Sequence, residues 1–201
     1  MTRNLVFYFH LLHHYLLSRS KFDIHSPFVY KIYSEILKDK TDYPEYHGPI
    51  IQKGKGNTSL FNKDYRLLFR LSKFFKPKTI LNLGTSDEAC ALHLALGFPG
   101  SQMISVHDNP GLIAGSGLFD MVLVLGDLPG NVILDYFSLI MQHIHNDSVL
   151  IFCNIHDSQK TNEVWNKIRN HSSVTLTIDL FNLGLVFCKL ELTKEDFILR
   201  Y

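Results

Sequence analysis

Residues 79–86 read TILNLGTS, a short apolar run followed by a glycine and two hydroxyl residues. The run Thr79–Leu83 has the length and composition of a buried β-strand. Gly84 allows a tight turn or a close approach to a ligand, and Thr85 and Ser86 can cap a following helix. Strand, glycine turn and helix in this order are typical of the ligand-binding end of a doubly wound α/β sheet.

Apolar strands and helices alternate downstream of this turn. Strands are expected over residues 102–106, 119–125 and 148–153, and helices over residues 86–96, 129–145 and 158–170. Near-continuous apolar strands separated by helices favour a parallel sheet that is covered on both faces. We therefore predict a three-layer α-β-α, doubly wound, mostly parallel sheet.

The last two expected strands, 174–180 and 185–192, are separated only by the residues FNLG at 181–184. A parallel crossover needs a dozen or more residues, so this pair must be an antiparallel hairpin at the C-terminal end of the sheet. Asn182 and Gly184 supply suitable turn chemistry.

Only eleven residues, DNPGLIAGSGL, separate the strand over 102–106 from the strand over 119–125. This segment is too short and too rich in glycine for a further helix and strand. One edge strand of the usual sheet should therefore be missing.

The first part of the chain has a different pattern. Ser26 and Pro27 form a helix start, and a second helix is expected over 60–75, after a loop with several glycines and prolines. We divide the chain into an N-terminal helical extension and loop, residues 1–76, and an α/β domain, residues 77–201, which together form one compact unit.

Composition limits the class of protein. The chain has 201 residues, of which 46% are hydrophobic and 19% charged, and a net charge of +1. These values support a folded core and predict no attraction to nucleic acid. Residues 4–17 are apolar, but the run is too short to span a membrane and contains three histidines, His10, His13 and His14. Its exposed apolar face would favour a homodimer.

The three cysteines, Cys90, Cys153 and Cys188, show neither a disulfide pattern nor a zinc spacing. No signal-peptide cleavage site follows the N-terminal apolar run. Both observations favour a cytoplasmic protein.

Three segments carry a resemblance to a known family: RSKFDIHSPFVY at 19–30, LFRLSKFFKPKTILNLGTS at 68–86, and IDLFNLGLVF at 178–187. They resemble a divergent group of bacterial O-methyltransferase-like proteins within the class I S-adenosylmethionine-dependent methyltransferases. The terminal hairpin is typical of that Rossmann-like methyltransferase fold and argues against a nicotinamide-binding one.

The resemblance implies S-adenosylmethionine as cofactor and a small molecule as substrate. It also implies a set of cofactor-binding positions: Asn82, Gly84, Thr85, Ser86, Asp108 and Gly126. Several acids of the family pattern are replaced here. Asn82 stands where the family places a carboxylate, and Leu125, Cys153 and Asn154 stand where carboxylates hold a divalent cation. Since a hard cation needs several oxygen ligands, we expect no metal site.

His156 is the best-placed candidate for a general base, with Asp157 beside it to orient the ring. An alternative interpretation is that both residues only cap the following helix. Two functions remain open from the sequence. The first is a small-molecule methyltransferase with an eroded cofactor and metal site, and the second is a catalytically inactive binding or interaction protein with the same fold.

Overall fold

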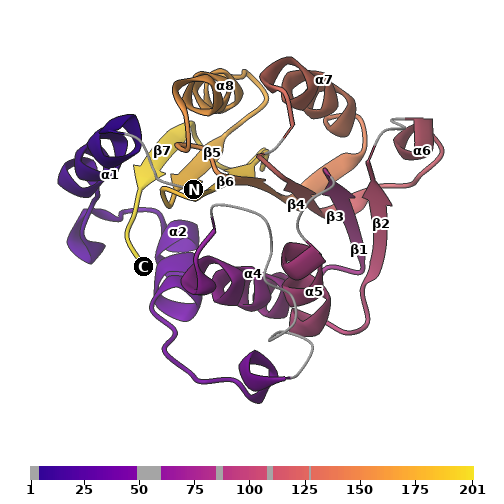
Figure 1. Ribbon diagram of the computed structural model, residues 1–201, viewed down its shortest axis with the longest axis horizontal. Coiled ribbons are helices and arrows are strands. Elements are labelled where there is room, and N and C mark those ends of the chain that lie inside the picture. Colours follow the sequence, from indigo (N-terminus) through magenta and orange to yellow (C-terminus); the bar gives the residue numbers. More distant parts are fainter. Residues whose placement is uncertain (1–4, 49–59, 85–87, 108–110, 127) are drawn as a thin grey trace.

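The computed structural model describes residues 5–48, 60–84, 88–107, 111–126 and 128–201. Within these ranges, seven strands form one sheet in the order β2-β1-β3-β4-β6-β5-β7 (Figure 1). The strands are β1 (Thr79–Leu83), β2 (Gln102–Val106), β3 (Phe119–Val124), β4 (Ile144–Cys153), β5 (Leu176–Asp179), β6 (Leu183–Phe187) and β7 (Glu195–Ile198).

The pairing of the strands confirms the predicted topology. Strand β1 pairs in parallel with β2 and β3, and β3 pairs in parallel with β4. Strand β6 is antiparallel to both β4 and β5. Strand β5 therefore runs in the same direction as β4, and the last residues of all strands except β6 share one edge of the sheet. We call this edge the carboxyl edge.

Helices cover both faces of the sheet, as expected. They are α1 (Leu5–Leu17), α2 (Pro27–Ile32), α4 (Asn62–Phe75), α5 (Glu88–Gly97), α6 (Gly111–Ala114), α7 (Gly130–Ile140) and α8 (Gln159–Arg169). Helices α2, α4 and α5 lie on one face, and α7 and α8 lie on the other (Figure 1). Helix α1 lies beside β7, at the end of the sheet away from β2.

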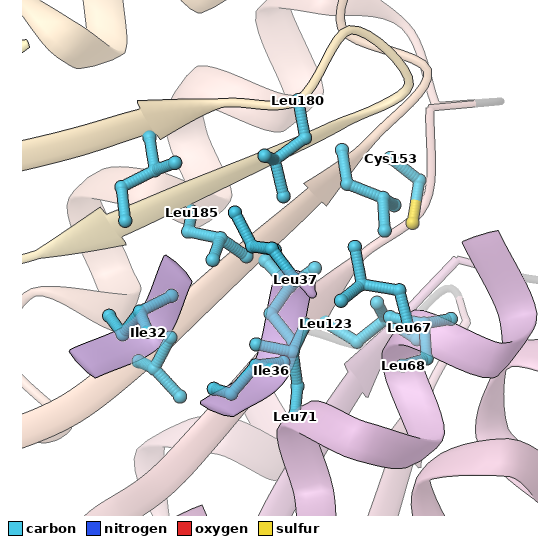
Figure 2. Close-up of a cluster of buried hydrophobic side chains, with 14 of the residues drawn as sticks. Ile32, Ile36, Leu37, Leu67, Leu68, Leu71, Leu123, Cys153, Leu180 and Leu185 are labelled. Carbon is cyan, nitrogen blue, oxygen red and sulfur yellow. The ribbon is translucent and has the colours of Figure 1, made fainter. Parts of the chain in front are cut away.

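The N-terminal helices share a core with the sheet. Ile32 at the end of α2 and Leu67 and Leu68 of α4 are fully buried in one cluster with Leu123 of β3 and Leu185 of β6 (Figure 2). Burial of side chains of this size contributes about 1.5–3 kcal/mol each. Segments before and after residue 77 therefore depend on each other for burial.

Local sequence signals set the predicted helix starts. The hydroxyl of Ser26 accepts a hydrogen bond from the Val29 N–H at 3.4 Å, and Pro27 occupies the first turn of α2. The hydroxyl of Ser158 likewise accepts from the Thr161 N–H at 3.2 Å at the start of α8. Both caps satisfy N–H groups that a helix leaves unpaired at its start.

The missing edge strand agrees with the observed sheet. In the described part of the chain the sheet ends at β2, and only the short helix α6 lies between β2 and β3. The helices and strands of the sequence prediction differ from the structure mainly in their ends. Helix α4 begins at Asn62 instead of Leu60, and β6 ends at Phe187 instead of Leu192.

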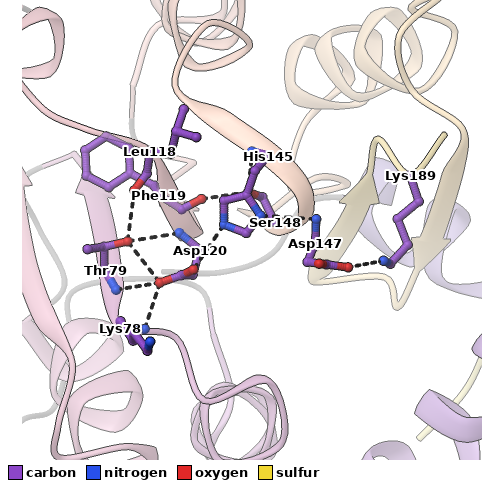
Figure 3. A network of polar contacts seen from close by, with 9 residues as sticks. All are labelled: Lys78, Thr79, Leu118, Phe119, Asp120, His145, Asp147, Ser148 and Lys189. Carbon is purple, nitrogen blue, oxygen red and sulfur yellow. Dashed lines mark hydrogen bonds and ion pairs between the residues drawn. The ribbon is translucent and has the colours of Figure 1, made fainter.

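The predicted helix over 129–145 was too long, because α7 ends at Ile140 and β4 already begins at Ile144. Contacts with β3 hold this segment extended (Figure 3). The His145 ring lies 3.0 Å from an Asp120 carboxylate oxygen, and the Ser148 hydroxyl donates to the Phe119 carbonyl at 2.7 Å. These partners are 25 or more residues away, so a local pattern could not reveal them.

The same network pairs the polar groups at the edge where β1 and β3 begin. The Asp120 carboxylate accepts hydrogen bonds from the N–H groups of Lys78 and Thr79, both at 2.8 Å. Burial alone would raise the pKa of Asp120, but the hydrogen bonds from Thr79, His145 and Lys78 outweigh it and lower that pKa. At this edge, Asp120 and the groups around it are paired within the protein.

Strand β7 was not foreseen. It pairs in parallel with β5 at the far end of the sheet, with Phe197 buried and Glu195 and Asp196 partly exposed. Its four residues include two acids, so its composition does not favour a strand. No helix among the described residues is long and apolar enough to cross a membrane.

Candidate functional site

Gly84 follows β1 with a φ of 109°, a conformation that L-residues rarely adopt. Its N–H donates to the Val106 carbonyl at 3.2 Å, and its own carbonyl lies 2.8 Å from Nδ1 of His107. The glycine predicted from the sequence therefore does form a constrained turn at the carboxyl edge. The predicted cofactor residues Thr85, Ser86 and Asp108 lie outside the described residues.

Asn82, the second predicted cofactor residue, is buried just before this turn. Its side-chain N–H group donates to the Ser105 hydroxyl at 3.4 Å. Its Oδ1 atom is buried and has no hydrogen-bond partner among the described residues. An unpaired buried acceptor costs about 1–3 kcal/mol, so this oxygen is suited to a donor on a ligand.

Gly126 and Asn154 meet at the ends of β3 and β4. A Cβ atom on Gly126 would lie 2.5 Å from the Cys153 carbonyl oxygen and 2.8 Å from the Asn154 Cβ, so only glycine fits. Asn154 has a φ of 58°, and its buried Oδ1 also lacks a partner in the described structure. We call Asn82, Gly84, Gly126 and Asn154 the cofactor turn, after the role that the family resemblance implies for the first three.

The residues at the family's metal positions do not fit a hard cation. Leu125 and Cys153 are 1% and 3% exposed and lie within one apolar cluster. Asn154 supplies the single oxygen ligand of this set, and a divalent hard cation takes six or more oxygens. Within the described ranges there is no group of three His, Cys, Asp or Glu side chains that could hold a metal ion.

His156, the candidate base, is held by contacts that the sequence did not reveal. Its Nε2 lies 2.7 Å from Oδ2 of Asp179, and its Nδ1 lies 2.9 Å from Oδ1 of Asn162. The neighbouring Asp157 is exposed, and its N–H donates to the Asn154 carbonyl. The carboxylate that orients the His156 ring is therefore Asp179, and Ser158 caps the following helix.

Asp179 is a buried carboxylate at the end of β5. Its oxygens accept hydrogen bonds from His156, from His14 at 3.2 Å, from the Trp165 indole N–H at 3.2 Å and from the Phe181 N–H at 2.9 Å. Burial alone would raise the pKa of this carboxyl, but His14 and His156 hold it far below its usual range. Asp179 thus anchors helix α1 to the sheet.

Helix α1 also contacts residues close to Asp179, and a cavity lies next to these contacts. Phe7 packs edge-on against Phe181, with 5.2 Å between ring centroids, and Nδ1 of His10 lies 3.4 Å from the His156 carbonyl. The cavity has a volume of about 310 Å³ and lies between α1 and α8, above β5 and β7. We call it the histidine cavity; its polar lining includes His10, His13, His14, His156, Asn166 and Arg169.

Asp179 is the functional residue that sequence reasoning missed. The signal was the single charged residue of the strand LTID, together with a histidine-rich helix that carries no acid. A buried carboxylate needs donors, and His14 is 165 residues away in the chain. His14 therefore anchors α1 to β5.

The fold is that of class I S-adenosylmethionine-dependent methyltransferases. The Podospora anserina methyltransferase PaMTH1, solved with S-adenosylhomocysteine, superposes with a TM-score of 0.54 at 12% identity, over 83% of this chain and 97% of that one. The Bacillus cereus O-methyltransferase, also solved with S-adenosylhomocysteine, gives 0.53 at 13% identity, over 79% and 96%.

The O-methyltransferase TomG of Streptomyces achromogenes, which takes part in tomaymycin synthesis and was solved with S-adenosylmethionine, gives a TM-score of 0.50 at 15% identity, over 94% and 99%. No family model matches the sequence, and no curated protein is significantly similar to it. The sequence is thus a divergent one on a shared fold.

Proposed function

We propose that this protein binds S-adenosylmethionine at the cofactor turn and transfers its methyl group to a small molecule without a metal ion. The observation that carries the proposal is the unpaired, buried Oδ1 of Asn82 directly before the constrained Gly84 turn. The ammonium group of the cofactor is a donor of the kind that this oxygen lacks. Bound there, the cofactor supplies an electrophilic methyl group.

The chain's own residues would act mainly by positioning. Asn82 and Asn154 offer acceptors from β1 and from the end of β4, and Gly84 and Gly126 leave room for close approach. Holding reactants in a productive arrangement can lower a barrier by about 7–11 kcal/mol in ideal cases. Thr85, Ser86 and Asp108 remain part of the proposed cofactor set.

His156 and Asp157 remain the candidates for catalytic residues, and their surroundings limit what each of them could do. Both ring nitrogens of His156 lie within hydrogen-bonding distance of oxygen atoms of Asn162 and Asp179. These contacts support a role of the ring in positioning groups at the carboxyl edge. Removing a proton from a substrate would require the Asn162 contact to open. The Asp157 side chain is exposed, so a substrate could reach it from solvent.

Calorimetric titration with S-adenosylmethionine and S-adenosylhomocysteine tests the proposal. We expect saturable binding, lost in Gly84→Ala, because a Cβ atom is strained at a φ of 109°. Gly117→Ala is the matched control, since a Cβ atom there meets nothing within 4 Å. Absence of binding by the folded wild-type protein at millimolar ligand would contradict the proposal.

The second candidate function is a catalytically inactive binding protein. The apolar Leu125 and Cys153, at positions where the resembling family keeps acids, favour it. Binding without methyl transfer to any member of a panel of hydroxylated small molecules would support this alternative. Transfer of a labelled methyl group to any acceptor would exclude it.

We also propose that residues 1–76 and 77–201 fold as one compact unit. We further propose that the protein forms a homodimer in which α1 of one copy packs against α1 of the other. Phe9, Leu12 and Leu16 follow one helical face and are 67%, 58% and 71% exposed. Light scattering should give twice the monomer mass, and Leu12→Glu with Leu16→Glu should give the monomer. A monomeric wild-type protein at micromolar concentration would contradict this proposal.

We propose that the protein is cytoplasmic and that it does not bind nucleic acid. Cys90, Cys153 and Cys188 are free thiols, which suits the reducing cytoplasm. The net charge of +1 gives no general attraction to nucleic acid.

A further inference from the structure

The histidine cavity lies apart from the cofactor turn. In the strand order, β5 is four positions from β1. At about 4.8 Å per strand, Asp179 at the end of β5 is about 19 Å from the Gly84 turn measured across the sheet. A ligand in the cavity would therefore occupy its own site on the carboxyl edge.

The polar groups around this cavity are one guanidinium, one carboxylate, and several histidine and amide side chains. Among the described residues that line it, Asp179 is the one acidic side chain, and its two oxygens are already occupied by His14, His156, Trp165 and the Phe181 N–H. The other polar lining side chains are three histidines and His156, two amides and one guanidinium. In the described part of the lining no further carboxylate is available to balance the guanidinium.

Arg169 is the residue that points to a ligand. It lies at the end of α8, lines the cavity, and its Nε atom is buried without a hydrogen-bond partner in the described structure. A guanidinium keeps its charge in proteins, and its planar fork matches the oxygens of a carboxylate or a phosphate. An unpaired buried donor of this kind is costly unless a ligand or water pairs with it.

Asn162 and Asn166 stand on the same helix as Arg169. The positions 162, 166 and 169 are spaced by four and three residues, which places them on one face of α8. His10, His13 and His14 of α1 supply the opposite wall. The guanidinium, amide and imidazole groups of these two walls include N–H groups that can surround a group with several acceptor oxygens.

We infer that the histidine cavity binds a small oxyanion-bearing metabolite, with Arg169 as the principal charge partner of its carboxylate or phosphate group. The volume of about 310 Å³ lies at the lower end of the range for small-molecule pockets, about 300–1,000 Å³. The site is distinct from the proposed cofactor site and does not depend on cofactor binding.

Titration of the full-length protein with inorganic phosphate and, separately, with succinate tests this inference. Calorimetry at constant ionic strength should show saturable binding of at least one probe. The probe that binds more tightly distinguishes a phosphate ligand from a carboxylate ligand. Absence of saturable binding of both probes up to about 50 mM, a concentration above ordinary metabolite affinities, would overturn the inference.

Three variants on α8 test the role of Arg169. Arg169→Gln should weaken binding about tenfold or more, as expected for the loss of a charged hydrogen bond. Arg169→Lys keeps the charge but not the fork and should give an intermediate loss. Lys167→Gln removes a charge from an exposed position of the same helix that does not line the cavity, and it should bind like the wild type.

Two results would overturn the assignment to this cavity. One is equal affinity of Arg169→Gln and the wild-type protein. The other is an equal loss in Lys167→Gln, which would indicate unspecific charge attraction. Gly84→Ala should bind the probe normally even if it no longer binds S-adenosylmethionine. Failure of the cavity proposal can therefore be told apart from failure of the cofactor proposal.

Discussion

The cofactor turn and the histidine cavity lie on the same edge of one sheet, but they leave opposite kinds of polar groups unpaired. At the turn, the unpaired atoms are the amide oxygens of Asn82 and Asn154, which are acceptors. At the cavity, the unpaired atom is the Nε donor of Arg169. The turn therefore suits a ligand that donates, such as an ammonium group, and the cavity suits one that accepts.

The two regions also differ in what holds them together. The turn depends on backbone geometry, namely the φ of Gly84 and the contact of Gly126 with the chain at Cys153. The cavity depends on one carboxylate, Asp179, that joins a strand to two histidines. Substitutions at the two regions should therefore separate ligand binding from stability in different ways.

The largest effect is expected from Asp179→Leu. This change leaves the donors of His14, His156 and Trp165 without their shared acceptor, and breaking a buried, charged network costs about 3–5 kcal/mol. Urea denaturation measures the loss. Asp147→Asn is the control, because Asp147 pairs with Lys189 at an exposed position near the start of β4 and should cost less than about 1 kcal/mol.

The pKa of Asp179 also predicts how the stability of the protein changes at acidic pH. The pKa of Asp179 is lower in the folded protein than in the unfolded chain. Its contribution to the free energy of unfolding is therefore fully present above about pH 4, the pKa of an unfolded aspartate, and is lost as the pH falls below it. Asp179→Asn should flatten the stability curve in that acid range. An unchanged curve would mean that Asp179 does not hold α1.

Gly126→Ala should give the next largest effect, and it should act on the turn. The added Cβ atom would meet backbone at 2.5 Å, and overpacking of this kind costs about 1–3 kcal/mol. Denaturation and cofactor calorimetry should both report a loss, while phosphate binding in the cavity should persist. Gly115→Ala, where a Cβ atom meets nothing within 4 Å, is the matched control. Equal behaviour of the two variants would show that the approach of β3 to β4 tolerates a side chain.

The smallest expected effect is a gain. Asn82→Asp places a carboxylate where Oδ1 is unpaired, and it should bind S-adenosylmethionine about tenfold more tightly, because a hydrogen bond to a charged group is worth about 1.5–3 kcal/mol. The ligand-free protein should lose stability, since the new charge is buried without a partner. Gln142→Glu makes the same amide-to-acid change at an exposed position before β4 and should change neither quantity. Weaker cofactor binding in Asn82→Asp would mean that Oδ1 does not face the ligand.

Local patterns were sufficient for most of the fold and for one part of the site. The apolar strands, the caps at Ser26 and Ser158, and the short hairpin all depend on neighbouring residues, so their effect can be predicted from the sequence. Gly84 was identifiable for the same reason, because its turn follows directly from β1.

The tertiary structure decided everything that joins distant segments. Strand β4 begins early because Asp120 and Phe119 hold residues 145 and 148, and β7 exists because β5 offers it an edge. Asp179 gains its function from helix α1, 165 residues earlier in the chain. A sequence records which side chains can donate or accept, but only the packed fold decides which of them find partners and which remain open to a ligand.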